Sequence, residues 1–268
     1  MNRRPLVFQP WFGPVLAPIA VGILLIAFWQ WSCRHWAIPI YLFPAPSDIA
    51  SAFFNDWPTL LGALWSTLRV TFAAFALAVV IGTLIAFLFV QSRLIELSLL
   101  PYAVLLQVTP IVAVAPLIII LVKDTPKALI LCATVIAIFP VISNTTIGLR
   151  SVDPGLLAYF RMCKAGRLAT LFRLRVPSAL PFFLAGLRIS SGLALIGAVV
   201  AEFVAGTGGR SAGLAYEILQ SGFQLDIPRM FAALAMITVT GVLLFAVMAG
   251  LQTVLLGNWH ESTMKTER

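Results

Sequence analysis

Six apolar segments, each long enough to cross a lipid bilayer, dominate this sequence. They cover residues 13–33, 62–90, 95–122, 128–148, 182–205 and 230–256. A helix needs about 20 apolar residues to cross the hydrocarbon core, and only helices or closed β-barrels satisfy all their backbone groups there. The alternating pattern of a barrel strand is absent from these segments. The sequence therefore predicts an all-α polytopic membrane protein with about six transmembrane helices.

The composition agrees with a membrane protein and argues against nucleic-acid binding. Of the 268 residues, 60% are hydrophobic and 10% are charged, whereas a soluble domain has about 25% charged residues. The formal net charge of +8 would require a basic face on a hydrophilic domain to bind nucleic acid, and the sequence contains no such domain. We interpret Cys33, Cys132 and Cys163 as reduced packing residues. His35 and His260 have no suitably spaced ligand partner, so no metal site is expected.

We expect residues 1–61 to form an N-terminal anchor span with an external interfacial segment, and residues 62–268 to form the transmembrane core. The first apolar segment follows Arg3 and Arg4 and has about 20 residues, more than the 7 to 15 of a signal-peptide core. It is therefore expected to be retained, with a twin-arginine export signal as the weaker alternative. Ser47 and Asp48 are expected to cap a short interfacial helix after the first span.

The distribution of basic residues predicts that both termini face the cytoplasm, because short cytoplasmic loops carry an excess of Lys and Arg. With the amino terminus inside, eleven basic residues fall on the cytoplasmic side: Arg3, Arg4, Arg93, Arg150, Arg161, Lys164, Arg167, Arg173, Arg175, Lys265 and Arg268. Five fall outside: Arg34, Lys123, Lys127, Arg210 and Arg229. Arg69 and Arg188 are expected near span ends, where long side chains reach the interface.

The segment 150–181 is the most basic part of the chain and is predicted to be a cytoplasmic loop between the fourth and fifth spans. Asp153 as a cap and Pro154 at the first helical position predict a short amphipathic helix. Its apolar residues are Leu156, Leu157, Phe160 and Cys163. Pro177 and Pro181 are expected to end the loop and start the fifth span. A docked protein and a lipid surface both fit this pattern.

Polar residues within the spans are candidates for a solute pathway. These are Gln107, Thr109, Ser143, Asn144 and Glu202. Hydrogen bonding between helices is an equally good explanation of the uncharged ones. Glu202 lies near the outer end of its span, so snorkelling or a pair with Arg69 competes with a pathway role. Pro101, Pro110 and Pro116 are expected to bend or break the third span.

Several strings resemble the permease subunits of bacterial ABC importers of the nitrate, sulfonate, taurine and thiamine-precursor group. They are YLFPAPSDIASAF, QVTPIVAVAPLIII, NTTIGLRSVDPGLLAYF, LFRLRVPSALPFFLAGLRISSGLALIGAVVAEFVAGTGG and GLAYEIL. The resemblance runs from about Phe43 to the end of the chain. It therefore involves the whole transmembrane core and not one isolated motif.

Permeases of this kind have a cytoplasmic signature, E-A-A-x3-G-x9-I-x-L-P, whose helix binds a cleft of the ATPase subunit. Counting back from Pro177 places Lys164 at the family glycine and Ala158, Tyr159 and Phe160 at the E-A-A positions. Gly166 lies only eleven residues before Pro177. Either the glycine is replaced in this chain or the turn has moved by two residues.

The resemblance implies a coupling helix and a set of partners. The coupling residues would be Asp153, Pro154, Leu157, Phe160, Arg161, Lys164, Gly166 and Pro177, and the pathway residues Gln107, Thr109, Asn144 and Glu202. The partners would be an ABC ATPase, a second permease copy forming a homodimer, an extracytoplasmic binding protein and membrane lipid, in a bacterial inner membrane. No G-x-x-x-x-G-K-[ST] phosphate loop occurs here, so ATP and Mg²⁺ are expected on the ATPase and no cofactor on this chain.

Two other classes are weaker explanations. A self-sufficient secondary transporter would show an internal repeat and buried ion-coupling residues, and we find no repeated half. An intramembrane enzyme would need paired carboxylates, a zinc site or a nucleophile with its base. The resemblance favours a thiamine precursor, pyrimidine or riboflavin as solute, with a sulfonate, taurine or nitrate as the alternative.

Overall fold

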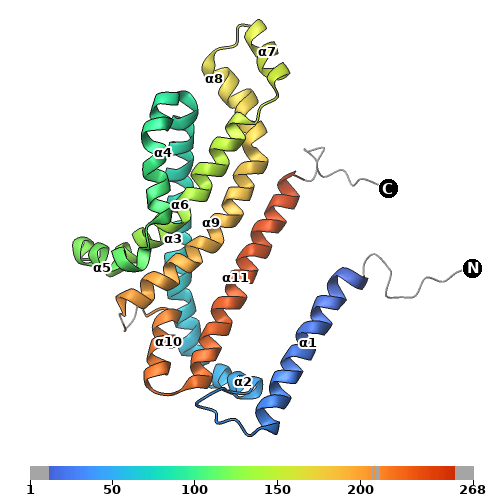
Figure 1. Cartoon of the computed structure of the whole chain (residues 1–268), viewed down its shortest axis with the longest axis vertical. Helices are drawn as coiled ribbons and strands as arrows, with labels where there is room; N and C mark the ends of the chain where they lie inside the picture. The colour runs from blue at the N-terminus through green and yellow to red at the C-terminus, as the bar shows by residue number, and fades with distance from the viewer. Residues whose placement is uncertain (1–11, 207, 209–211, 257–268) are drawn as a thin grey trace, which may run out of the picture. The chain divides into compact units, whose positions relative to one another are not determined.

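The computed structural model describes residues 12–206, 208 and 212–256, and this part of the chain is built from helices without strands (Figure 1). The helices are α1 (Phe12–His35), α2 (Pro46–Asn55), α3 (Trp57–Gln91), α4 (Arg93–Val108), α5 (Ile111–Val122), α6 (Thr125–Arg150), α7 (Pro154–Met162), α8 (Arg167–Thr170), α9 (Val176–Ala205), α10 (Leu214–Phe223) and α11 (Ile227–Leu256). Five helical stretches, α1, α3, α6, α8 through α9, and α11, are long and apolar enough to span a membrane. The pair α4 and α5 would be a sixth, so the predicted fold class is confirmed.

The third predicted span is broken at one proline and not at three. The axes of α4 and α5 differ by 100°. Thr109 ends α4 in an extended conformation (ψ 123°), and Pro110 directly precedes α5. A residue before proline is driven out of the helical region by steric clash with the proline ring. Pro101 and Pro116 lie inside α4 and α5, so neither of them breaks the span.

One compact unit of the fold combines residues 1–61 with residues 217–235. In its described part, the ring of Phe43 lies 5.2 Å from that of Trp29 and 5.8 Å, edge on, from that of Phe231. Arg34 donates a hydrogen bond of 2.9 Å to Asp48. The cap of α2 is Ala45, two residues before Ser47, the first of the two predicted caps. Asp48 instead accepts the Ala45 backbone N–H from the third helical position.

The other unit, residues 62–216 and 236–268, is organised around α6 and α9, which run antiparallel and side by side (Figure 1). Small residues allow the close approach, as in many membrane helix pairs. A Cβ atom on Gly148 would lie 2.8 Å from the Cβ of Phe182, and one on Gly197 would lie 2.8 Å from the Cα of Ala133. Between these contacts, Ser190 donates a 2.7 Å hydrogen bond to the Ala137 carbonyl.

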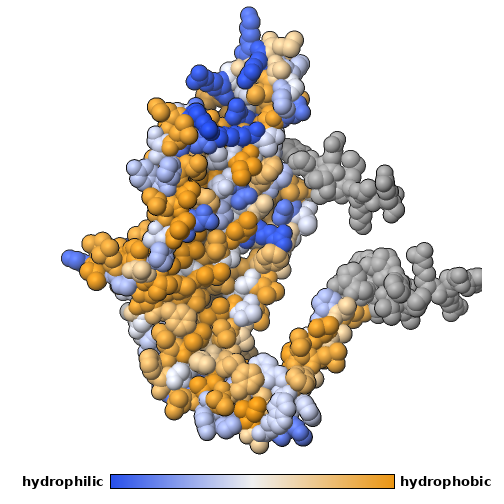
Figure 2. Space-filling model, viewed as in Figure 1, coloured by the Kyte–Doolittle hydropathy of each residue, from blue (hydrophilic) through white to orange (hydrophobic). Residues whose placement is uncertain are grey.

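The surface of this unit separates an apolar body from a polar end. Figure 2 shows hydrophobic residues over the body, while hydrophilic residues gather where α7 and α8 form its tip. Exposed apolar side chains on α3 include Val80 and Leu84, at 58% and 59% exposure. Such a surface suits lipid or another membrane subunit. Five of the basic residues used to predict the orientation lie outside the described residues, as does His260: Arg3, Arg4, Arg210, Lys265 and Arg268.

Candidate functional site

Helix α7 is closed at both ends by local hydrogen bonds, as the sequence predicted for its start. Asp153 accepts the backbone N–H of Leu156 at 3.0 Å, and Pro154 occupies the first turn, where its missing N–H costs nothing. At the other end, Lys164 N–H donates to the Arg161 carbonyl and Ala165 N–H to the Phe160 carbonyl, both at 3.0 Å. This pair of bonds is a Schellman motif, which places its left-handed residue at Lys164.

The backbone at Lys164 has the conformation that glycine adopts most easily. Its φ is +52°, whereas Gly166 has a φ of −65° and precedes α8. A left-handed conformation costs a residue with a Cβ atom about 1–2 kcal/mol. The sharp turn after α7 therefore lies at position 164 and not at position 166.

The two apolar faces of α7 differ in exposure. Leu156, Tyr159 and Met162 are 51%, 61% and 82% exposed, and their spacing of three places them on one side of the helix. We expected Leu157 and Phe160 to contact a partner, and both are half-buried. Leu157 lines a hollow between α7 and the rest of the unit.

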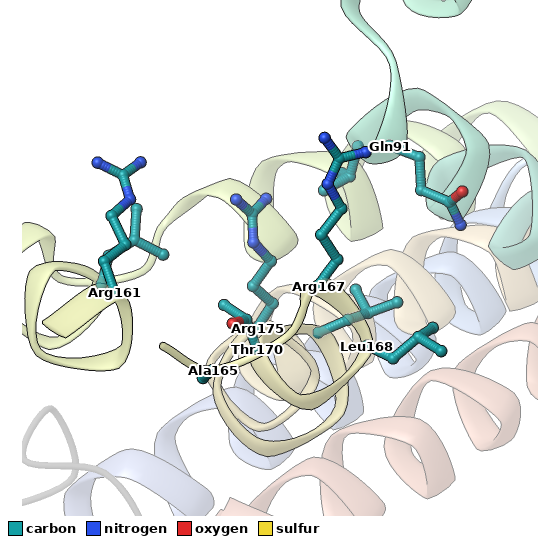
Figure 3. Close-up of a pocket in the computed structure, with 10 residues that line it drawn as sticks. Gln91, Arg161, Ala165, Arg167, Leu168, Thr170 and Arg175 are labelled. Carbon is teal, nitrogen blue, oxygen red and sulfur yellow. The ribbon is translucent and has the colours of Figure 1, made fainter. Parts of the chain in front are cut away.

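That hollow, of about 630 Å³, lies beneath α7 and beside the end of α3 (Figure 3). Its polar lining is Gln91, Arg161, Arg167, Thr170 and Arg175, and its apolar lining is Val90, Leu157, Ala165, Leu168 and Leu171. Figure 3 shows the three guanidinium groups rising on the same side of their helices. No ion pair joins these three arginines to an acid within the described ranges, so this end of the unit attracts negative groups.

Much of the segment 150–181, which we predicted to be a loop, is helical, because helical structure resumes after α7 at Arg167. A π-helical stretch, Leu171–Arg175, joins α8 to α9 without a break. Pro177 sits in the first turn of α9, as a starting residue should. Pro181 lies inside α9 and does not mark its beginning, because the helix starts at Val176, six residues before the approximate start predicted for the fifth span.

Arg188 consequently lies well inside α9 and not near its end. At 1.5 Å per residue it is about 18 Å from Val176 and about 25 Å from Ala205. Its Cζ atom lies 3.9 Å from the centroid of the Phe245 ring. A cation over an aromatic face gains about 2 kcal/mol when shielded from water. Arg188 is half-buried, so this contact offsets part of the cost, about 2.5–3.5 kcal/mol, of an arginine at the centre of a membrane helix.

Glu202 is buried in a closed hydrogen-bond network. It is 4% exposed, accepts a 3.0 Å hydrogen bond from the Thr67 hydroxyl and accepts a 3.3 Å bond from the Ala215 backbone. The Thr67 hydroxyl oxygen accepts the Leu214 N–H at 2.9 Å. The expected pair with Arg69 is wrong, because neither bond to this carboxylate comes from Arg69. The Cζ atom of Arg69 instead lies 5.2 Å from the centroid of a ring of Trp65, one turn away on α3.

The other predicted pathway residues are not joined to this network. Gln107 and Thr109 are exposed at the end of α4, where the Thr109 hydroxyl donates to the Leu105 carbonyl at 2.6 Å. Asn144 is half-buried in α6 and donates to the Pro140 carbonyl at 2.9 Å. These bonds stay within one helix. A pathway role for the four residues remains a prediction.

Comparison with known proteins identifies the fold and the family. The model of the family described as "binding-protein-dependent transport system inner membrane component" matches residues 78–257. The chain belongs to this family. The riboflavin transport system permease protein RibX of Chloroflexus aurantiacus is 34% identical over 266 residues, covering 98% of this chain and 97% of that protein. The formylaminopyrimidine transport permease protein ThiX of Halalkalibacterium halodurans is 31% identical over 249 residues, covering 90% and 95%.

Solved structures agree with the fold of the permease. The MetNI methionine ABC transporter, in an inward-facing conformation, gives a TM-score of 0.64 at 18% identity and covers 73% of this chain and 95% of that chain. The family and the apolar helices together make the permease an integral, multi-pass protein of the inner membrane. It is a transport component, as the resemblance indicated.

Two charge clusters of the permease were missed by the sequence analysis. Glu96 accepts hydrogen bonds from Arg150 and Arg93 in one unit of the fold. In the other, Arg229 donates to Glu217 at 2.7 Å. Both acids lie beside long apolar runs, and an acid there usually has a partner. That signal was available, but the sequence does not say which arginine is the partner.

The described part of the chain contains no group of three or more His, Cys, Asp or Glu side chains that could hold a metal ion. Among the described cysteines, Cys33 and Cys132 are buried and Cys163 is exposed at the end of α7. Cys163 therefore offers a natural thiol for attaching a probe to this helix.

Proposed function

We propose that the permease forms the membrane pathway of an ATP-driven importer that takes up a small organic solute with the help of an external binding protein. The observation that supports this proposal best is α7, a capped helix that presents Leu156, Tyr159 and Met162 to the outside of the unit. Exposed apolar residues with a polar rim are typical of a protein contact. Arg161 and the arginines of the hollow supply that rim.

In this proposal an ABC ATPase binds α7 on the cytoplasmic side of the membrane, and both termini lie on that side. Asp153 and Pro154 start the helix, and Lys164 turns the chain out of it. We assign the family glycine position to Lys164, since its left-handed backbone is what a glycine would provide. In this assignment Gly166 is not the turn residue of the family signature, and it directly precedes α8.

The exposures on α7 support a narrower proposal for the residues that would meet the ATPase. We propose that the outward residues Leu156, Tyr159 and Met162 form the contact. Leu157 and Phe160 would support α7 from beneath, and Pro177 would begin the rigid helix α9 that transmits its movement. ATP and Mg²⁺ bind the ATPase, whose closure would move α7 and thereby change which side of the membrane the pathway faces.

We propose a homodimer as the transport unit, with the pathway between the two copies. Gln107, Thr109 and Asn144 are our candidates for its lining. Glu202 is a weaker candidate than before, because its carboxylate already has two hydrogen-bond partners and 4% exposure. A thiamine precursor, pyrimidine or riboflavin is the preferred solute, since relatives named for riboflavin and formylaminopyrimidine span nearly the whole chain. A sulfonate, taurine or nitrate is the alternative.

The test is ATPase-dependent uptake by the assembled complex in proteoliposomes. The permease, its ATPase and its binding protein are purified together and supplied with riboflavin, formylaminopyrimidine, ethanesulfonate or nitrate. We expect uptake of one of these that stops when the phosphate loop of the ATPase is mutated. Uptake by the permease alone, driven by an ion gradient, would instead establish a secondary transporter.

A further inference from the structure

We propose that Glu96, Arg150 and the backbone carbonyl of Phe89 form a clamp that positions the coupling helix α7. The inference rests on the proposed function, because it assigns the clamp a role in transmitting movement between α7 and the membrane helices. Glu96 and Arg150 are positioning residues in this proposal. Neither is expected to touch the solute or ATP.

The clamp joins the ends of three helices. Arg150, the last residue of α6, donates two hydrogen bonds to the Glu96 carboxylate in α4, of 2.5 and 2.6 Å. Its Nη2 atom also donates to the Phe89 carbonyl, in the last turn of α3, at 3.3 Å. A two-pronged bond between guanidinium and carboxylate fixes angle as well as distance. The three helix ends are therefore held in one relative orientation.

Each member of the clamp also suits its own helix end. Glu96 lies in the first turn of α4, where the helix dipole favours a negative charge, and Arg150 lies in the last turn of α6, where it favours a positive one. The Phe89 carbonyl is among the last four of α3, which lack partners within their own helix. Phe89 is 1% exposed, so water cannot readily replace Arg150 there.

The chain leads directly from the clamp to the coupling helix. Only Ser151 and Val152 separate Arg150 from Asp153, the cap of α7. The Ser151 hydroxyl donates to the Gly148 carbonyl at 2.8 Å, which shortens the free path further. A rotation of α7 should therefore move the end of α6 directly, and the hydrogen bonds of the clamp should transmit this movement to α3 and α4.

The hollow beneath α7 makes this connection more important. Val90 and Gln91, which directly follow Phe89, line its far side, and Leu157 and Arg161 of α7 line its near side. An open space of about 630 Å³ transmits force poorly, because the atoms across it are not in contact. The short chain from α7 to Arg150, continued by the hydrogen bonds of Arg150, is thus a direct route from α7 to α3 and α4.

Arg93 provides a matched control within the same cluster. It donates to Glu96 at 2.7 Å, but it lies on α4 three residues away and its side chain is 69% exposed. The corresponding exposures are 36% for Arg150 and 8% for Glu96. Removing Arg93 deletes a charge and a hydrogen bond without separating any two helices. Removing Arg150 deletes the connection itself.

The experiment measures the movement of α7 through its own thiol, Cys163. The complete importer is assembled in nanodiscs with a nitroxide spin label on Cys163 of each permease copy, while Cys33 and Cys132 are buried. Pulsed electron spin resonance gives the distance distribution between the labels, without nucleotide and after trapping with ATP, Mg²⁺ and vanadate. The variants are Arg150→Gln, Glu96→Gln, their double variant and Arg93→Gln.

We expect the wild type and Arg93→Gln to show the same nucleotide-dependent shift in distance. Arg150→Gln should retain less than half of this shift and give a broader distribution in both states. The double variant leaves no buried charge without a partner, so it should assemble well and still show the reduced shift. Because the two residues act as one connection, the loss in the double variant should equal that in Arg150→Gln.

Three results would count against the proposal, and one of them would also contradict the proposed function. If Arg150→Gln and the double variant both show the full nucleotide-dependent change in label distance, the cluster only stabilises the fold and does not position α7. A wild type with no ATPase bound, or with no nucleotide-dependent shift, would contradict the proposed function itself. Lower yield of Arg150→Gln with an unchanged shift in the complexes that assemble also counts against the clamp.

Discussion

Replacing the outward residues of α7 tests the ATPase contact most directly. We predict that Leu156→Asp with Met162→Asp strongly weakens binding of the ATPase while leaving the membrane helices folded. The two residues are 51% and 82% exposed, so the rest of the protein depends little on them. Asp is also tolerated on the surface of a short helix better than in its packed face.

The size of the effect follows from the surface that a partner would cover. Burying an aliphatic side chain of this size completely contributes about 2 kcal/mol. We multiply this value by the exposed fraction of each side chain, so that Leu156 would contribute about 1 kcal/mol and Met162 about 1.6 kcal/mol to the free energy of binding. Their loss predicts a dissociation constant about 70-fold higher. The cost of removing two carboxylates from water would increase this value.

The assay is the affinity of the purified ATPase for the permease in nanodiscs, measured by biolayer interferometry. Leu225→Asp is the matched control, because Leu225 is 70% exposed and lies between α10 and α11. It should leave the affinity unchanged. An affinity within threefold of the wild type for the double α7 variant would refute this assignment of the contact.

Three other predictions follow from single residues. Lys164→Gly should relieve the strain of the left-handed backbone at this position and stabilise α7 by about 1 kcal/mol. Uptake should stay at or above the wild-type level. Reduced uptake would show that the lysine charge is required. Gly148→Ala should overpack α6 against α9 and lower the free energy of unfolding by about 1–3 kcal/mol. Gly250→Ala is the control, because the space around Gly250 is open, and it should leave the free energy of unfolding unchanged. Equal melting temperatures for the two variants would contradict this packing. Glu202→Gln should leave the complex assembled and change the uptake rate if the carboxylate contributes to the pathway. A wild-type uptake rate would show that Glu202 has only a structural role, through its hydrogen bond with Thr67.

The predictions that held were those governed by short stretches of chain. Asp153 and Pro154 start α7 because a cap acts on backbone groups three residues away. Pro110 breaks the third span because its ring clashes with the residue before it. Pro101, Pro116 and Pro181 do not interrupt their helices, and this has the opposite cause. A proline can be retained inside a membrane helix where neighbouring helices and local adjustments accommodate it.

The candidate site was found from the sequence in outline but not in detail. The helix in the basic segment was predicted, with Leu157 and Phe160 as its contact residues, whereas our proposal uses the more exposed Leu156, Tyr159 and Met162. All five are apolar and lie on a nine-residue helix. Periodicity shows which of them share a face, but only the packing of α7 over the hollow shows which face is left open.

The sequence by itself determined the class of the protein, the number of spans and the position of α7, because hydrophobic length, proline geometry and helix capping act over a few residues. The tertiary structure decided which charges meet. Arg150 and Glu96 are 54 positions apart, and Thr67 and Glu202 are 135 apart. Any of several basic or hydroxyl residues could satisfy a buried acid equally well in chemical terms. Only the packing of the helices brings one of them within reach, and this selection determines which residues can hold α7 in place.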